Sequence, residues 1–153
     1  MKKAQDNDVR IHKGSAKMEK MGKTKVLLAD DDAGFRKLLA MQVKAWGYDL
    51  IEAENGKQAL ALATTEKPDI ILLDYMMPEM DGFAVLEQIR KTNTDVAVVM
   101  LTAYTEEKYI KMAVKLGIKA FVPKISAYAD THAYVKTALE TIVRNLKAKE
   151  TAQ

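Results

Sequence analysis

Five short apolar runs divide this chain, and each is followed by a longer stretch in which apolar residues recur every three or four positions. Unbroken apolar runs such as VLLA and VAVVML are typical of strands buried on both faces of a sheet, whereas DLIEA at residues 49–53 is typical of a half-buried strand. The expected strands cover residues 26–29, 49–53, 69–73, 96–101 and 119–124. We therefore predict an α/β fold, a doubly wound, five-stranded parallel sheet built as (βα)5 with right-handed crossovers.

The stretches between these runs carry helix start and stop signals. Gly47 and Gly117 follow apolar-periodic segments and are suited to helix ends. Asp32, Asp81 and Asp130 precede such segments and are expected to cap them. The expected helices cover residues 35–46, 57–66, 83–91, 105–117 and 130–149.

Charge separates the N-terminal segment from the rest of the chain. Residues 1–25 hold eight basic and three acidic residues, a net charge of +5, whereas the remainder holds 16 basic and 18 acidic residues. The N-terminal segment also lacks apolar periodicity, which predicts a solvated tail. We predict a flexible basic tail at 1–23, one folded domain at 24–149 and a short C-terminal tail at 150–153.

Composition limits the cellular compartments in which the protein is expected and the chemistry that it can perform. The chain has no cysteine, which excludes disulfides and thiol catalysis. No apolar run approaches the roughly 18 residues of a membrane span, and no apolar segment of a signal peptide follows the basic start. These features predict a cytoplasmic protein.

Polar residues follow four of the five expected strands, at the point where each strand ends. Three aspartates follow the first strand, and single polar residues end three others: Asp30, Asp31, Asp32, Asp74, Thr102 and Lys124. In an open parallel sheet, ligands bind beyond the carboxyl ends of the strands. Any one of these aspartates could be only a turn or cap residue, and Asp32 fits that role because a helix begins after it. The convergence of four strand ends is what indicates a site.

The residue types at this edge favour a hard cation and a phosphoryl group. Crowded carboxylates repel one another unless a cation lies among them. A site of oxygen ligands without His or Cys suits Mg²⁺ or Mn²⁺. A hydroxyl and an ammonium beside them suit phosphoryl oxygens, so the edge predicts metal-assisted phosphoryl transfer with a carboxylate nucleophile.

At these residues the chain resembles the receiver domain of response regulators, the phosphorylated partner in two-component signalling. The matching segments are "VLLADDDAGFRKLL", "GYDLIEAENGKQAL", "PDIILLDYMMPEMDGFAVL", "VVMLTAY" and "GIKAFVPK". The resemblance covers residues 25–148 and implies a flavodoxin-like sheet with strand order 2-1-3-4-5.

The resemblance assigns a role to each polar strand end. It implies that Asp74 accepts the phosphoryl group and that Mg²⁺ is held by Asp30, Asp31, Asp74 and the backbone carbonyl of Met76. It further implies that Thr102 and Lys124 contact the phosphoryl group. Phe121 stands where the family places an aromatic side chain that turns inward on activation.

The same resemblance implies partners and a mode of output. The phosphoryl donor would be a sensor histidine kinase or a histidine phosphotransfer protein. Output would pass to a protein target through the face of the fourth helix, fifth strand and fifth helix, with homodimerisation through that face left open. Only six residues follow Lys147, so we expect a stand-alone chemotaxis-like receiver in a phosphorelay, with no direct DNA binding. We do not expect an enzyme, but a switch that assists its own phosphorylation and slow dephosphorylation.

Two alternatives stay open, and the first rests on a departure from the family pattern. Receivers usually place Pro after the strand-five Lys, whereas this chain has Pro123 before Lys124 and Ile125 after it. A cis bond before Ile125 costs about 2.5–4 kcal/mol, so we expect a trans bond. The departure would suit a receiver-like binding module that works without phosphorylation. A phosphatase-like hydrolase with Asp30 as nucleophile is the second alternative, although Gly34 and the lack of a cap domain disfavour it.

Overall fold

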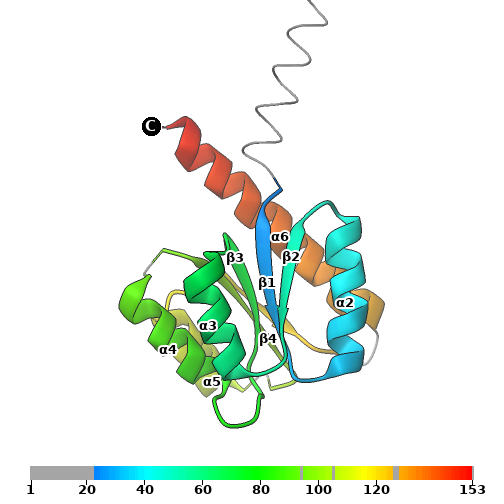
Figure 1. Ribbon diagram of the computed structural model, residues 1–153, viewed down its shortest axis with the longest axis vertical. Coiled ribbons are helices and arrows are strands. Elements are labelled where there is room, and N and C mark those ends of the chain that lie inside the picture. Colours follow the sequence, from blue (N-terminus) through cyan, green and yellow to red (C-terminus); the bar gives the residue numbers. More distant parts are fainter. Residues whose placement is uncertain (1–22, 94, 105, 126–127, 153) are drawn as a thin grey trace, which may run out of the picture.

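The computed structural model describes residues 23–93, 95–104, 106–125 and 128–152 and contains one five-stranded sheet (Figure 1). Its strands are β1 (Lys25–Ala29), β2 (Asp49–Ala53), β3 (Ile70–Asp74), β4 (Ala97–Thr102) and β5 (Ala120–Pro123). Its helices are α2 (Ala33–Ala45), α3 (Gly56–Glu66), α4 (Gly82–Thr92), α5 (Glu107–Lys115) and α6 (Tyr128–Thr151). All strand pairs are parallel in the order β2-β1-β3-β4-β5, so the predicted fold is confirmed.

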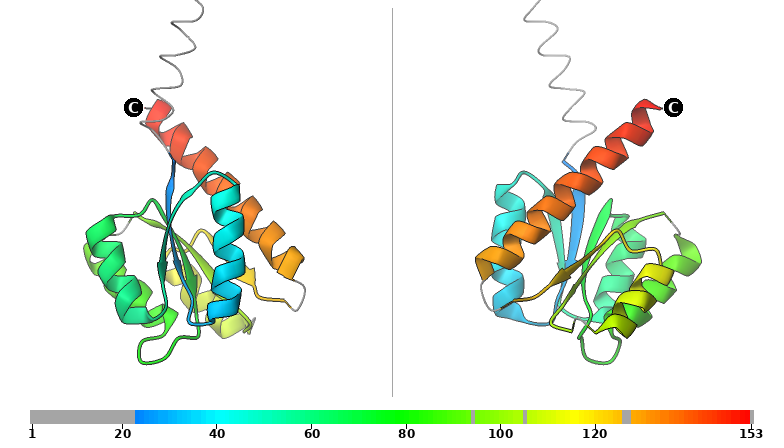
Figure 2. Two further views of the ribbon diagram at one scale, coloured as in Figure 1. Left: turned by 45° about the vertical axis from the view of Figure 1, so that its right-hand side comes forward. Right: turned by 180° about the vertical axis from the view of Figure 1, so that it is seen from behind.

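Helices cover both faces of the sheet (Figure 2). Alternate residues of β1 serve the two faces: Val26 and Leu28 pack with α2 and α6, and Leu27 and Ala29 pack with α3, α4 and α5. Because β1, β3 and β4 are enclosed in this way, their side chains are almost entirely buried. This enclosure is the physical reason for the unbroken apolar runs.

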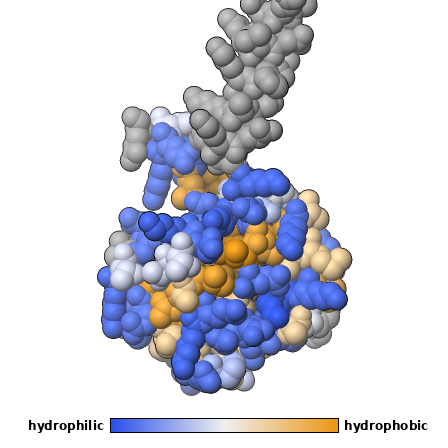
Figure 3. Space-filling model, in the orientation of Figure 1, coloured by the Kyte–Doolittle hydropathy of each residue, from blue (hydrophilic) through white to orange (hydrophobic). Residues whose placement is uncertain are grey.

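Strand β2 lies at one edge of the sheet and is less enclosed. Its side chains Leu50 and Ile51 are half-buried, and Asp49 and Glu52 are exposed. Figure 3 shows a hydrophobic band on the surface where β2 lies between α2 and α3, with hydrophilic residues on both sides of the band. The mixed composition of β2 therefore follows from its edge position.

The helix boundaries confirm two of the three predicted caps. The Asp32 and Asp81 side chains accept hydrogen bonds from the backbone N–H of Phe35 and Ala84, at 3.1 and 2.9 Å. The prediction for Asp130 was wrong, because α6 begins at Tyr128 and places Asp130 within its first turn. An acidic residue there still interacts favourably with the N-terminal end of the helix dipole.

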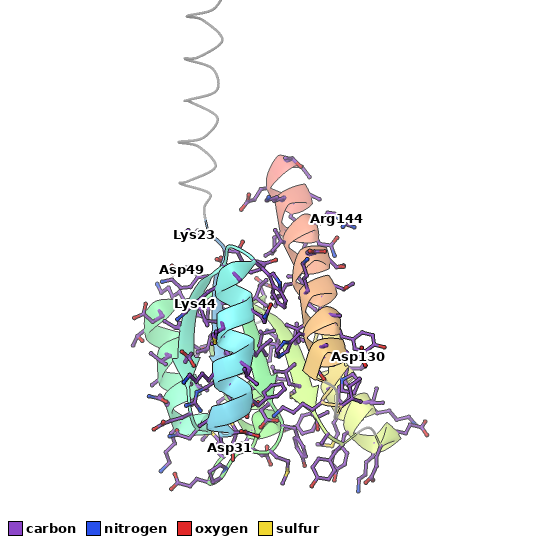
Figure 4. The ribbon with its side chains drawn as sticks, turned by 90° about the vertical axis from the view of Figure 1, so that its right-hand side faces the viewer. Lys23, Asp31, Lys44, Asp49, Asp130 and Arg144 are labelled. Carbon is purple, nitrogen blue, oxygen red and sulfur yellow. The ribbon has the colours of Figure 1, made fainter. Side chains whose placement is uncertain are left out.

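Both ends of the described fold lie at the same edge of the sheet. Lys23 leads into β1 at the amino ends of the strands, and α6 runs past the sheet toward that side (Figures 1 and 4). The predicted tail at 1–23 lies outside the described residues except for Lys23. Within the described residues, no helix is both long enough and apolar enough to cross a membrane.

Arg90 of α4 joins three segments at this amino edge. Its guanidinium donates to the carbonyls of Leu116 (2.8 Å), Val96 (2.8 Å) and Gly117 (3.2 Å). These bonds link the end of α4 to the start of β4 and to the turn after α5. A charged donor on carbonyl groups contributes more than a neutral one.

An Arg90→Met variant is therefore expected to lose about 2–3 kcal/mol of unfolding free energy, because three carbonyls lose their donor. Urea unfolding followed by circular dichroism measures the change. The exposed Lys91→Met on the same helix is the control, with an expected change of under about 0.5 kcal/mol. Equal losses in the two variants would contradict the role of Arg90.

Candidate functional site

The carboxyl ends of β1, β3, β4 and β5 meet at one edge of the sheet. Ladder pairing sets Asp74 beside Leu101 and Thr102 beside Pro123. Asp31 marks this edge in Figure 4, at the end of the molecule opposite Lys23 and Asp49. The four polar strand ends of the sequence thus gather at the carboxyl edge, as predicted.

Three carboxylates form the centre of the site. Asp30 and Asp74 are buried, with 0% and 3% of their surface exposed, whereas Asp31 is exposed. One oxygen from each of the three lies within 4.8 Å of the other two. Two buried carboxylates and one facing solvent therefore share a space small enough for a single cation.

Lys124 supplies the opposing charge. Its Nζ lies 2.5 Å from Asp30 Oδ2 and 3.2 Å from Asp74 Oδ1. The same ammonium lies 4.3 Å from the centroid of the Phe35 ring, a cation–π contact with the first turn of α2. Lys124 therefore bridges the two buried carboxylates with its charge held over an aromatic face.

The crowding changes the protonation of these groups. Burial, reinforced by the negative charge of Asp30, raises the pKa of Asp74 from 3.8 to about 7. Burial also raises the pKa of Asp30, although Lys124 opposes the rise. Burial alone would lower the pKa of Lys124, but its two carboxylate partners outweigh burial and raise it. The single ammonium therefore does not offset the effect of burial on the pKa of either Asp30 or Asp74.

This donor set fits a hard divalent cation. The three residues offer only carboxylate oxygens, which Mg²⁺ prefers, and the exposed Asp31 leaves the group open to solvent. Mg²⁺ commonly keeps water ligands, which an open side allows. Asp30, Asp31 and Asp74 are the residues that would hold it.

The three consecutive aspartates have different roles. The Asp32 N–H donates to Asp30 Oδ1 at 2.9 Å, while its own carboxylate caps α2. Asp32 therefore orients Asp30 from the backbone and takes no part in the carboxylate group. The cap role that the sequence indicates for Asp32 is confirmed.

Arg36 is a site residue that the sequence analysis missed. Its Nη1 donates to the backbone carbonyl of Asp30 at 2.7 Å, and its Nε lies 3.4 Å from Glu52 Oε1. The side chain thus ties the end of β1 to β2 beneath the aspartates. Its place one turn into the helix after the aspartates was the available signal.

Thr102 ends β4 as a buried hydroxyl. Its Oγ1 accepts a hydrogen bond from the N–H of Tyr104 at 2.9 Å, which fixes the first residues after the strand.

Four aromatic rings form a cluster in which neighbouring ring centroids lie 4.9–6.3 Å apart. They belong to Tyr75, Phe83, Tyr104 and Tyr109, a cluster that the sequence pattern did not predict.

Two glycines allow the loop after β3 to pack closely. A Cβ at Gly82 would collide with the backbone carbonyl of Asp74, and one at Gly56 with the carbonyl of Met80. The Gly82 N–H also donates to Tyr75 O at 2.8 Å. Met76 lies in this loop and is 50% exposed, whereas Met77 is buried. The predicted metal contact of the Met76 carbonyl stays a prediction.

The departure around Lys124 is accommodated without a cis bond. The Lys124–Ile125 bond is trans, as expected, since the described residues contain no cis peptide. Pro123 has no N–H, and the N–H of the next residue, Lys124, donates to Thr102 O in β4 at 2.7 Å. Phe121, in β5, is half-buried and packs on the α3, α4 and α5 side of the sheet. The altered order thus leaves Lys124 at the site.

Comparisons with known proteins agree with this arrangement. The model of the response regulator receiver domain matches residues 26–136. Among curated proteins, the probable transcriptional regulator ycf27 of Guillardia theta is 37% identical over 117 residues, covering 76% of this chain and 46% of its own length. The alkaline phosphatase synthesis transcriptional regulatory protein PhoP of Bacillus subtilis is 37% identical over 115 residues, covering 75% and 48%.

Solved structures match over most of their length. The Francisella response regulator 1452 receiver domain superposes with a TM-score of 0.68 at 29% identity, covering 78% of this chain and 98% of that domain. The CheX-CheY-BeF3-Mg complex of Borrelia burgdorferi gives a TM-score of 0.73 at 26% identity, covering 81% and 92%. The chain spans about half the length of the curated relatives. Because those relatives are named as transcriptional regulators, they lend no support to the expectations of a stand-alone protein and of no DNA binding.

Proposed function

Since this chain belongs to the response regulator receiver family of two-component signalling, we propose that it accepts a phosphoryl group on Asp74. The observation that carries the proposal is the placement of Asp74: a buried carboxylate, 3.2 Å from the Lys124 ammonium and grouped with Asp30 and Asp31. A nucleophile held among cation ligands and beside a fixed ammonium is suited to phosphoryl transfer.

The transfer requires one bond to form and one to break. An Asp74 oxygen bonds to phosphorus as the P–N bond of a donor phosphohistidine breaks, and the imidazole leaves with the bonding electron pair. When bound, Mg²⁺ would offset the negative charge that gathers between nucleophile and phosphoryl oxygens. Lys124 supplies a second positive charge there, and the Thr102 hydroxyl a hydrogen bond to the product.

We propose a sensor histidine kinase or histidine phosphotransfer protein as donor, with the exchange taking place in the cytoplasm. The protein would act as a switch and not as an enzyme with turnover on a separate substrate. Output would pass through the face of α5, β5 and α6, the chain's fourth helix, fifth strand and fifth helix. The acyl phosphate would favour one packing of that face, since it makes contacts that the free carboxylate does not.

Neither alternative from the sequence gains an observation in its favour. The binding-module alternative depended on the altered order around Lys124, yet the ammonium reaches both buried carboxylates. The hydrolase alternative needs Asp30 as nucleophile. Its Oδ1 accepts from the Asp32 N–H and its Oδ2 is paired with Lys124, an arrangement that suits a ligand.

The proposal is tested by incubating the protein with Mg²⁺ and acetyl phosphate. The expected result is a mass gain of one phosphoryl group that is stable in acid and removed by hydroxylamine, as an acyl phosphate is. Borohydride reduction and peptide mapping should place it on Asp74. No gain would support the binding module, and continuous hydrolysis of a phosphate ester would support the hydrolase.

A further inference from the structure

A buried threonine of α6 holds the turn that follows β5. Thr131 is fully buried, and its Oγ1 accepts a hydrogen bond from the N–H of Ile125 at 3.0 Å. The same oxygen lies 3.5 Å from the carbonyls of Pro123 and Ile125, either of which can accept the hydroxyl proton. One side chain thus contacts the backbone on both sides of Lys124.

Lys124 is consequently anchored at two successive amides. Its own N–H donates to Thr102 O in β4, and the next N–H donates to Thr131 in α6. The first anchor ties Lys124 to the sheet, and the second ties it to the helix that covers the sheet. The second anchor depends on the order Pro123-Lys124-Ile125, because Ile125, unlike a proline, has an N–H that needs an acceptor.

The side chain of Lys124 depends on this backbone. Its ammonium must reach Asp30 Oδ2 at 2.5 Å and Asp74 Oδ1 at 3.2 Å from a strand end. A displacement of about 1 Å in a catalytic group can cost about a hundredfold in rate. A looser turn would therefore change the position of the Lys124 ammonium relative to Asp74.

We propose that Thr131 is a positioning residue for phosphoryl transfer, holding Lys124 toward Asp74 by accepting the Ile125 N–H. This inference rests on the proposed function of Asp74. Thr131 does not touch the reacting atoms and acts only through Lys124. A threonine that merely stabilised the start of α6 would affect folding and leave the transfer rate of folded protein unchanged.

The experiment compares Thr131→Val, which removes the hydroxyl and keeps the shape, with Thr131→Ser, which keeps the hydroxyl. Initial rates with acetyl phosphate are measured where circular dichroism shows each protein to be folded. Thr131→Val is expected to be slower by about tenfold or more, and Thr131→Ser to stay within about threefold of wild type. Mg²⁺ affinity is expected to change by less than about twofold, because the three carboxylates are untouched.

A matched control and a double variant separate positioning from folding. Thr137→Val makes the same change at an exposed site of α6 and should leave the rate unchanged. In a Lys124→Met background, Thr131→Val should slow the reaction by less than about twofold, because the group it positions is gone. An undiminished effect in that background would overturn the inference.

The outcomes also distinguish a failure of this inference from a failure of the proposed function. No phosphoryl uptake by wild-type protein overturns the proposed function, and the inference with it. Uptake by wild type and by Thr131→Val at equal rates overturns the inference alone. Amide hydrogen exchange of wild-type protein gives a measurement independent of any variant: the Ile125 N–H should be protected, and rapid exchange in the folded protein would overturn the proposal.

Discussion

An Asp74→Asn variant is expected to lose phosphoryl uptake completely and yet to be more stable than the wild-type protein. The loss follows from removing the proposed nucleophile. The gain in stability follows from the raised pKa of Asp74, which burial and the charge of Asp30 move from 3.8 to about 7. A neutral isostere removes the buried charge and its repulsion with Asp30.

The pH dependence of this gain follows from linkage. A raised pKa means that the folded state binds the Asp74 proton more tightly than the unfolded state does. The stability contribution is fully present below pH 3.8 and is lost as the pH rises through about 7. A pKa raised by about three units lowers the unfolding free energy above pH 7 by on the order of 4 kcal/mol. The variant also loses the ion pair between Asp74 and Lys124, which reduces its gain in stability. We expect Asp74→Asn to gain about 2 kcal/mol at pH 8 and little near pH 4.

Urea unfolding at both pH values with a metal chelator measures this difference. Asp49→Asn is the matched control, because it removes the same charge from an exposed position at the opposite edge of the sheet. It should change the unfolding free energy by less than about 0.5 kcal/mol. Added Mg²⁺ should stabilise wild type more than Asp74→Asn, which lacks one of the three carboxylates, and this narrows the difference between them. An Asp74→Asn protein less stable than wild type at pH 8 would contradict the account.

Neutralising Asp31 is expected to weaken cation binding far more than neutralising its neighbour Asp32. Asp31→Asn removes one of the three carboxylates whose oxygens lie within 4.8 Å. Asp32→Asn removes the same charge one residue later, where the side chain caps α2 and where Asn is an equally good cap. We expect Asp31→Asn to weaken Mg²⁺ binding by about tenfold or more and Asp32→Asn by less than about threefold.

Calorimetric titration with Mg²⁺ measures both affinities, and acetyl phosphate gives the matching rates. The rate of Asp31→Asn should fall with its Mg²⁺ occupancy, whereas Asp32→Asn should phosphorylate like wild type. Because the two changes are chemically identical, net charge cannot explain a difference between them. Equal losses of affinity would show that the aspartates act as a general negative field, and the assigned ligands would be wrong.

The fold could be predicted because its signals are local. The runs that form β1, β3 and β4 are apolar without alternation, as expected for strands of a sheet covered on both faces. Asp32 and Asp81 could be predicted as caps, since capping needs only a side chain beside a helix start. Asp130 failed because the helix begins two residues earlier, in a stretch whose composition gives no sharp boundary.

The site could be predicted only in part, because some of its contacts join residues far apart in sequence. The strand-end rule gathered Asp30, Asp74, Thr102 and Lys124, since parallel strands end at one edge. It could not show that Arg36 would reach the carbonyl of Asp30, or that Thr131 would accept the N–H of Ile125. Those contacts depend on how α2 and α6 lie against the sheet, and the packing of side chains between helix and sheet determines that placement.

The position of the two ends of the described fold has a practical consequence. Lys23 and the last turns of α6 lie at the amino edge of the sheet, and Asp31, which shares the carboxylate group with Asp74, lies at the opposite edge (Figures 1 and 4). A fluorophore, a surface linker or a fused reporter at either end would therefore leave the phosphoryl donor an open approach. Tethering the protein by one end to a sensor chip should preserve uptake at Asp74, so donor docking could be followed on an oriented layer.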